Sequence, residues 1–371
     1  MAYDPRTEDY QRLGLRFART LSGQDPFGAA RAMMGFSRRF QQNRDALPQS
    51  DEDRAFHLVA EATEIIDYDL PFAPEEDIER MLREAGHLLE EAYDLDPHCH
   101  DARRMLEVLS QPGFDEYYDY LAAHADEVRQ DCERQAEEVG GSRTTDEDQL
   151  AADLALRPWV RWRAQQASRA LICGRYKLAA RLAEELLEQN PLDPVDARFT
   201  AALAYAKLED EAALDSLARR CAVLSAHRGG EDPWMQLSRV ALAHKRRAWR
   251  DAERTVRSLV ATYPHAGITL CRQDELPDGV FSRLAVGPRS EDELILTVSE
   301  GTVLLQEGCT PDSRGPFGDW LAHCAPVREA VLRDQSHTPE DERIVGGAPA
   351  GEGSADGERP ADDAAGEGAS E

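Results

Sequence analysis

The segment His98-Cys99-His100-Asp101 groups four residues of types that bind metal ions. A structural zinc site needs about four such ligands that converge on one point. Side chains two positions apart on a helix point in different directions, so His98 and His100 would diverge. The segment also follows Pro97, where a polar turn between two helices is expected. We therefore interpret it as the solvated start of a helix and predict no metal site.

The acidic residues do not single out a catalytic pair. Asp and Glu together number 71 in a chain of 371 residues, and they are spread over its whole length. General acid–base catalysis needs two titratable groups placed at a reacting bond, and no such pair stands out. A nucleophile elbow, a phosphate-binding glycine loop and a dinucleotide fingerprint are all missing from the sequence. We predict no enzymatic activity and no cofactor.

The stretch 157–181 is rich in Arg and Lys and contains no acidic residue, although the net charge of the chain is -28. Arg161 and Arg169 lie eight positions apart, which places them within about 80° of each other around a helix. Arg163 points elsewhere. We predict that Arg161 and Arg169 contact an acidic partner and that Arg163 pairs within the fold. The alternative is that these arginines pair with Asp and Glu of neighbouring helices.

Tryptophan residues accompany the basic residues. Trp159 and Trp162 lie within the basic stretch, and Trp234 precedes a second basic run at His244–Arg250. Aromatic rings beside arginines supply apolar contact in many binding sites. We expect Trp159, Trp162 and Trp234 to line a groove for an acidic peptide.

Two amphipathic helices would position these residues. The first is expected at Trp159–Cys173 and the second at Tyr176–Gln189, where Leu and Ala recur at helical spacing between glutamates. Gly174 would end the first helix, and Pro191 would follow the end of the second. Helices joined so closely must lie antiparallel. The pair cannot bury both apolar faces alone, so further pairs must pack against it.

This unit resembles a tetratricopeptide repeat, in which a glycine at the turn is followed by an aromatic residue, a small residue and a closing proline. Parts of the same pattern recur twice elsewhere, at spacings that are not multiples of 34 residues, so the array is interrupted. The residues at the pattern positions are Gly174, Tyr176, Ala179 and Pro191 in the central unit, Trp249, Ala252 and Pro264 after it, and Ala85, Ala92 and Pro97 before it.

The resemblance implies an all-α fold, a helix-pair tetratricopeptide-like solenoid with extra terminal helices and a disordered C-terminal tail. An irregular helical bundle is the alternative. The resemblance also implies a scaffold that binds a protein or peptide in a groove lined by the first helix of each pair. Family members that grip an acidic carboxyl terminus use Lys and Asn there. The matching positions hold Arg161, Ala164 and Ser168, so that clamp is missing.

Composition shifts divide the chain into five regions. One of them, the capping region at 265–334, contains the segment 290–306, which fits a helix with Ser290 and Glu293 as a capping box. The β-branched residues of this segment also allow a hairpin. We favour the helix. A last helix is expected at Phe317–Asp334. The regions are an N-terminal helical region with one degenerate repeat (1–139), a hinge (140–145), the repeat array (146–264), an atypical capping region (265–334) and a disordered acidic tail (335–371).

The overall composition narrows the class of function. A negative net charge repels phosphate, so no nucleic-acid partner is expected. No apolar run approaches the roughly 18 residues of a membrane helix, and the N-terminus lacks a secretory signal, so we expect a cytoplasmic protein. The sequence predicts a non-enzymatic interaction scaffold of unknown oligomeric state. The alternative is a regulatory or enzyme-associated module with a ligand site in 265–334.

Overall fold

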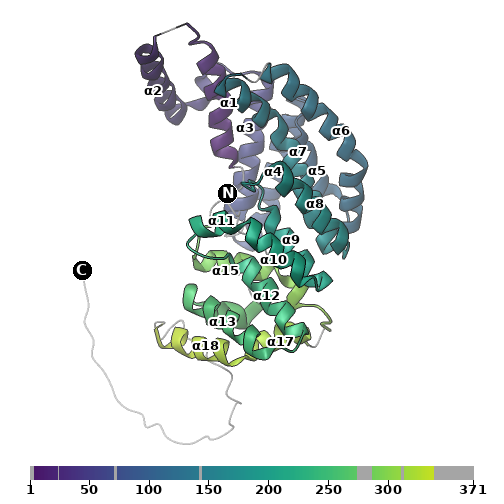
Figure 1. Cartoon of the computed structure of the whole chain (residues 1–371). Helices are drawn as coiled ribbons and strands as arrows, with labels where there is room; N and C mark the ends of the chain where they lie inside the picture. The colour runs from purple at the N-terminus through teal and green to yellow at the C-terminus, as the bar shows by residue number, and fades with distance from the viewer. Residues whose placement is uncertain are drawn as a thin grey trace, which may run out of the picture.

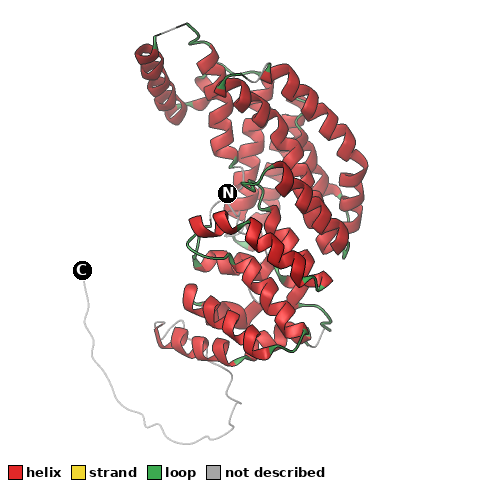
Figure 2. Ribbon diagram, in the orientation of Figure 1, coloured by secondary structure: helices red, strands yellow, loops and turns green. Residues whose placement is uncertain are grey.

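The computed structural model describes residues 4–23, 25–70, 73–141, 144–273, 286–310 and 313–337. Within these ranges the regular structure is helical, and one isolated β-bridge joins Thr310 to Ser313. Figure 2 shows this all-α composition. The expected all-α class is therefore confirmed. None of the helices in the described ranges combines the length and the apolar character that crossing a bilayer requires.

The first half of the chain forms long helices that follow one another closely. A short 3-10 turn, η1 (Arg44–Ala46), precedes α3, and a π-helical turn, η2 (Ile65–Asp69), extends it. The helices of this half are α1 (Pro5–Arg19), α2 (Pro26–Gln42), α3 (Asp51–Glu64), α4 (Glu75–Leu95), α5 (His100–Ser110), α6 (Phe114–Gly140) and α7 (Asp146–Ile172).

The second half contains shorter helices. The predicted helix in 290–306 is confirmed as α15 and α16, with the Ser290 hydroxyl accepting a hydrogen bond from the backbone N–H of Glu293 at 3.2 Å. The helices of this half are α8 (Tyr176–Gln189), α9 (Ala197–Leu208), α10 (Glu211–Arg220), α11 (Ala222–His227), α12 (Pro233–Lys245), α13 (Trp249–Thr262), α14 (Ala266–Arg272), α15 (Glu291–Glu300), α16 (Thr302–Leu305), α17 (Pro316–His323) and α18 (Ala325–His337).

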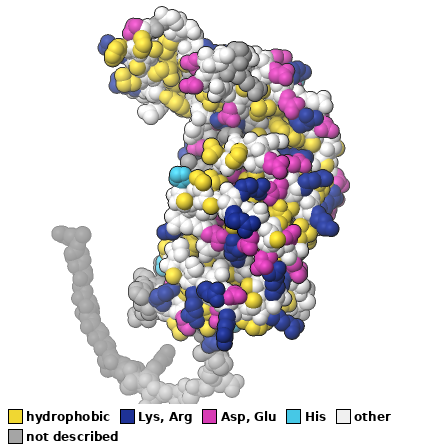
Figure 3. Space-filling view, in the orientation of Figure 1, with side chains coloured by type: hydrophobic (Ala, Val, Ile, Leu, Met, Phe, Trp, Pro, Cys, Tyr) yellow, Lys and Arg dark blue, Asp and Glu magenta, His cyan; other side chains and the backbone are white. Residues whose placement is uncertain are grey.

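The helices stack into a curved, elongated body (Figure 1). Helix α2 projects at one end, and α17 and α18 lie at the other. On the face shown in Figure 3, acidic and basic side chains are interspersed, and apolar side chains gather on α2, where Phe27 and Met34 are exposed.

The three closing prolines lie just after the ends of helices, as the sequence predicted. Helices α4, α8 and α13 each end two residues before a proline, at Pro97, Pro191 and Pro264. The cap residue before each proline is in an extended conformation, because a following proline disfavours the helical region. The small residues of the pattern are in the core: the side chains of Ala85, Ala92, Ala179 and Ala252 are 0 % exposed.

The turns inside the helix pairs share one geometry. After α7, the N–H of Arg175 donates to the carbonyl of Ala170 at 2.8 Å, and the equivalent bonds after α9 and α12 are 3.0 and 2.9 Å long. Each turn has one residue in the left-handed region, with φ of 73° at Gly174, 58° at Glu209 and 58° at Arg247. This backbone hydrogen bond, together with a residue in the left-handed region, defines the Schellman motif at the C-terminus of a helix.

Three predicted boundaries differ from the structure. Helix α7 begins at Asp146 rather than Trp159 and continues through Pro158. The predicted last helix is split, because Cys324 is extended and Pro326 lies in the first turn of α18, where its missing N–H costs no helical bond. Helix α18 continues to His337, into the predicted tail. The rest of the tail, and the segment 274–285 around Phe281, lie outside the described residues.

The segment 140–145, where we predicted a hinge, connects two helices that pack along each other. Helices α6 and α7 share one core cluster, in which Tyr117, Leu121 and Val128 from α6 contact Trp159 and Trp162 from α7. Thr145 caps α7 by accepting a hydrogen bond from the N–H of Asp148 at 3.1 Å. The hydrophobic core therefore continues across the expected boundary.

Candidate ligand-binding cavity

A cavity of about 520 Å³ lies between α3, η2 and α5 on one side and α7 and the start of α9 on the other. Much of its wall is apolar, and charged side chains of both signs are placed along it: Asp67, Asp101, Arg104, Arg161, Arg169 and Glu300. The apolar residues of the wall include Phe56, Val59, Ile66, Met105, Ala164 and Val195. A concave, mostly apolar surface with a few polar groups is the usual form of a ligand site.

The π-helical turn η2 places Asp67 at this cavity. Its backbone closes with a bond from the N–H of Leu70 to the carbonyl of Ile65, which widens the helix by one residue. Burial raises the pKa of the Asp67 carboxyl to about 6, although the nearby Arg104 guanidinium acts in the opposite direction. The carboxyl is therefore neutral in mildly acidic solution and ionised above that pH.

Arg169 and Arg161, the two predicted contact residues, both line the cavity, and Arg169 is the one without a carboxylate partner among the described residues. Its guanidinium lies over the rings of Phe114 and Tyr117, at 5.2 and 5.6 Å from their centroids. The Gln165 amide oxygen, oriented toward it, accepts bonds from Nε and Nη2 at 3.1 Å. Burial lowers the pKa of Arg169, and among the described residues it has no carboxylate partner.

Arg104 supplies a second guanidinium to the cavity. Its Nη2 lies 3.4 Å from Oδ1 of Asp101, and its side chain is largely buried. Its Nε atom is buried without a hydrogen-bond partner. Arg104 and Arg169 repel each other electrostatically, which also disfavours the charged form of Arg169. Of the three guanidinium groups that line the cavity, those of Arg104 and Arg161 have Asp101 as a partner, whereas that of Arg169 has no carboxylate partner among the described residues.

Arg161 also lines the cavity, but its guanidinium is held by two carboxylates of the fold. It donates from Nε to Oδ1 of Asp101 at 2.8 Å and from Nη1 to Oε2 of Glu8 at 2.7 Å. These bonds join α7 to α5 and to α1. A guanidinium held by two carboxylates is committed to the fold, so the alternative of pairing with neighbouring helices holds for Arg161.

The two acids that hold Arg161 were missed in the sequence. Burial opposes ionisation of Asp101, yet the charges of Arg161 and Arg104 lower its pKa to about 2. Burial likewise opposes ionisation of Glu8, and the charges of Arg161 and Arg12 outweigh it, so the pKa of Glu8 is also lowered. Glu8 is 153 positions from Arg161, and local spacing carries no signal for such a pair.

Other basic residues of the stretch are also paired. Arg163 contacts Glu185 of α8 and donates to the Gln166 side chain at 2.8 Å, so its predicted pairing within the fold is confirmed. Arg175 lies 3.1 Å from Asp115 and 3.2 Å from Asp119 of α6.

The three tryptophans belong to the core, which corrects the expectation that they line a groove. Trp159 and Trp162 pack against α6, and the indole N–H of Trp162 donates to the carbonyl of Leu121 at 3.0 Å. Trp234 stacks on Phe199 with ring centroids 3.8 Å apart, and its N–H donates to Glu300 at 2.7 Å. Buried rings with satisfied N–H groups are typical of packing residues.

The two histidines of the first motif converge, contrary to the expected divergence. Nδ1 of His98 and Nε2 of His100 lie 2.9 and 2.7 Å from Oδ2 of Asp131 on α6. The reason is that α5 begins only at His100, with Cys99 in a non-helical conformation as its cap. The helical spacing rule therefore does not apply to His98.

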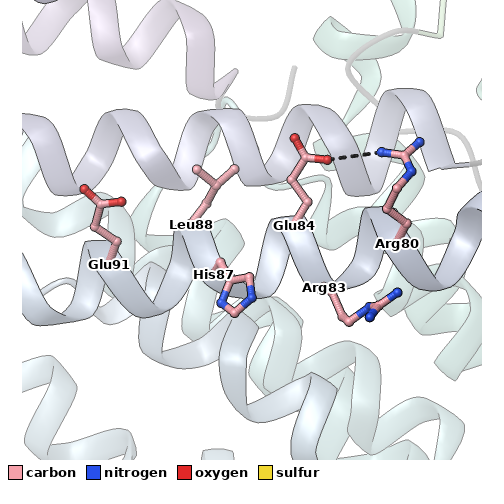
Figure 4. A pocket seen from close by; sticks show the side chains of 6 residues that line it. All are labelled: Arg80, Arg83, Glu84, His87, Leu88 and Glu91. Atoms are coloured by element: carbon pink, nitrogen blue, oxygen red, sulfur yellow. Dashed lines mark hydrogen bonds and ion pairs between the residues drawn. The ribbon is translucent and has the colours of Figure 1, made fainter.

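A second hollow lies on the surface of α4 (Figure 4). Its six lining residues all belong to this one helix, and Arg80 bonds to Glu84 at 3.4 Å within it. A hollow formed by one helix face does not enclose a ligand, so we favour the cavity beside α7.

Comparison of the chain with protein-family models, curated proteins and solved structures found no match. The functional interpretation therefore depends on the geometry of the cavity.

Proposed function

We propose that the protein is a non-enzymatic scaffold that binds an acidic segment of a partner protein or peptide in the cavity beside α7. The observation that carries this proposal is Arg169, a half-buried guanidinium that reaches the cavity and lacks a carboxylate partner among the described residues. A carboxylate that entered the cavity would form a charge-assisted bond with Arg169 where the local dielectric constant is low.

The remaining walls suit a peptide side chain. Apolar residues such as Met105 and Val195 can cover its aliphatic carbons, and Ser168 and Thr200 offer hydroxyls. Asp67 sets a pH dependence, because its carboxylate repels an acidic ligand once it is ionised. Since the pKa of Asp67 is about 6, we expect tighter binding of an acidic segment at pH 5 than at pH 7.5.

The architecture that we propose for the scaffold is a tetratricopeptide-like solenoid. Three observations support it: the recurrence of one turn geometry after α7, α9 and α12, the buried alanines of the pattern, and the ordered contacts of α7 with α8, α8 with α9, and α9 with α12. The first helices of successive pairs also contact one another, as α7 does with α9. A stack of helix pairs leaves a continuous surface that is formed by the first helix of each pair.

The test is a comparison of partners captured from the native cell. Wild-type protein, Arg169→Ser and Arg181→Ser are used as baits at low and moderate salt, and bound proteins are identified by mass spectrometry. Arg181 is a matched control because it belongs to the same basic stretch and its side chain is 69 % exposed. We expect salt-sensitive partners to be captured by wild type and Arg181→Ser and lost with Arg169→Ser. Equal capture by all three would contradict the proposal.

A further inference from the structure

His98, His100 and Asp131 bring three ligand atoms to within 4.8 Å of one another. His98 belongs to the turn before α5, His100 is the first residue of α5, and Asp131 lies on the neighbouring helix α6. Residues from two separate elements thus meet at one point.

We propose that His98, His100 and Asp131 bind one Zn²⁺ ion and so join the start of α5 to α6. None of these three residues lines the cavity, and the proposal does not depend on the proposed function. Two imidazole nitrogens and one carboxylate oxygen are a ligand set that zinc prefers, with a fourth position left for water.

The ligand atoms are defined by the contacts of each side chain. The His100 ring is buried, its Nδ1 has no hydrogen-bond partner, and Nε2 faces Asp131, so Nε2 is the atom that can ligate. Nδ1 of His98 faces the same carboxylate oxygen. Arg134 occupies the other carboxylate oxygen of Asp131, which leaves Oδ2 for monodentate binding.

The present spacing has to adjust to hold an ion. Ligands of a tetrahedral zinc ion with bonds of about 2.0–2.1 Å lie about 3.3 Å apart. The two N–O distances are 2.9 and 2.7 Å, so the carboxylate has to move outward by about 0.5 Å, and the two histidine nitrogens, which lie within 4.8 Å of each other, have to settle at the same spacing. The side chain of His98 is 58 % exposed, which gives an ion and its water a path from solvent.

Two neighbouring side chains, Gln135 and Arg134, affect the binding of an ion at this site. Gln135 donates to Oδ2 of Asp131 at 3.1 Å and can hold that oxygen in place. The guanidinium of Arg134 repels a cation, but its side chain is 57 % exposed, and solvent screens the repulsion. Removal of the Arg134 charge should therefore strengthen zinc binding without altering a ligand.

The test is isothermal titration of the full chain with zinc sulfate after treatment with a chelator. We expect one Zn²⁺ per chain, an affinity at least about tenfold weaker in His98→Ala and Asp131→Asn, and a tighter complex in Arg134→Ala. His87→Ala is the control, because His87 is an exposed histidine of α4 that pairs with Glu90 on the same helix. X-ray absorption of the zinc complex should show nitrogen and oxygen ligands at about 2.0–2.1 Å and no sulfur at about 2.3 Å.

His98 is the first choice of variant because its exposed side chain contributes little to the core, so His98→Ala should fold as wild type does. Circular dichroism checks this. Mg²⁺ should not compete, since it prefers oxygen ligands. Zinc affinity that is unchanged in both His98→Ala and Asp131→Asn, a sulfur ligand in the absorption spectrum, or the absence of zinc binding in wild type would each overturn the proposal.

Discussion

Arg161 of α7 and Asp101 of α5 form a paired contact in the interior, with Nε 2.8 Å from Oδ1 and Nη2 in contact with Oδ2. Asp101 is 2 % exposed, so its charge depends on this partner. Glu8 of α1 contacts the same guanidinium. These contacts therefore link three helices that are far apart in the sequence. Arg161, which was expected to bind a partner, takes part in the packing of the interior.

We expect Arg161→Met to lower the free energy of unfolding by about 3–5 kcal/mol, because it leaves two carboxylates buried without their main partner. Urea denaturation followed by circular dichroism measures this. Arg181→Met is the control, and its effect should stay within about 0.5 kcal/mol because the side chain is exposed. Equal stability of the two variants would show that the buried pair does not hold the helices together.

Asp67 should make stability depend on pH in a defined window. Its folded pKa is about 6, above the unfolded value of about 3.9, so the folded state holds the proton more tightly. This contribution is fully present below pH 4 and is lost as the pH rises through 6. We expect Asp67→Asn to be more stable than wild type at pH 7.5 by about 1–3 kcal/mol and to show no such advantage at pH 4. A constant difference between pH 4 and 7.5 would contradict the raised pKa.

Ala179 tests the close packing of α8. The side chain is 0 % exposed and belongs to the largest core cluster, so Ala179→Trp should cost about 1–3 kcal/mol or more through overpacking. Ala123→Trp is the control, because Ala123 is an exposed residue of α6. Thermal unfolding compares the two variants, and an unchanged melting temperature for Ala179→Trp would remove α8 from the core.

Substitutions at two residues in the left-handed conformation should change the stability of the protein in opposite directions. Arg247 has φ of 58° and is exposed, so Arg247→Gly should stabilise the protein by about 0.5–1 kcal/mol by relieving backbone strain. Gly174 has φ of 73°, and Gly174→Ala should destabilise it by about 1 kcal/mol. Chemical denaturation measures both. Changes of the same sign would argue against a shared turn geometry.

These turns also show why the sequence pattern found only part of the architecture. The motif expects glycine after the first helix, and this chain has it at Gly174. Glu209 and Arg247 adopt the same conformation without being glycine, because the Schellman bond and the packing of the flanking helices compensate the strain. The closing prolines and the small residues were predictable, because proline and close packing each impose a strict local requirement.

The candidate site was less predictable. Arg169 was identified from charge and spacing, but Asp67 reaches the cavity through a π-helical turn, and the sequence carries no clear signal for an extra residue in a helix. The two carboxylate partners of Arg161 were not predicted, because they are distant from it in the sequence. His98 and His100 were expected to diverge because both were placed on a helix, whereas α5 begins at the second of them.

The most direct test of the account is the binding of a fluorescein-labelled hexaglutamate peptide, followed by fluorescence anisotropy at low salt and pH 5 and 7.5. The variants are Arg169→Ser, which removes the cavity charge, Ser168→Trp, which fills the cavity, and Arg181→Ser as the exposed control. The account predicts saturable binding that is at least about tenfold weaker in the first two variants, unchanged in the third, and tighter at pH 5 in wild type, since a charge-assisted bond contributes about 1.5–3 kcal/mol. Binding that is absent in wild type, or equal in wild type and Arg169→Ser, would contradict it.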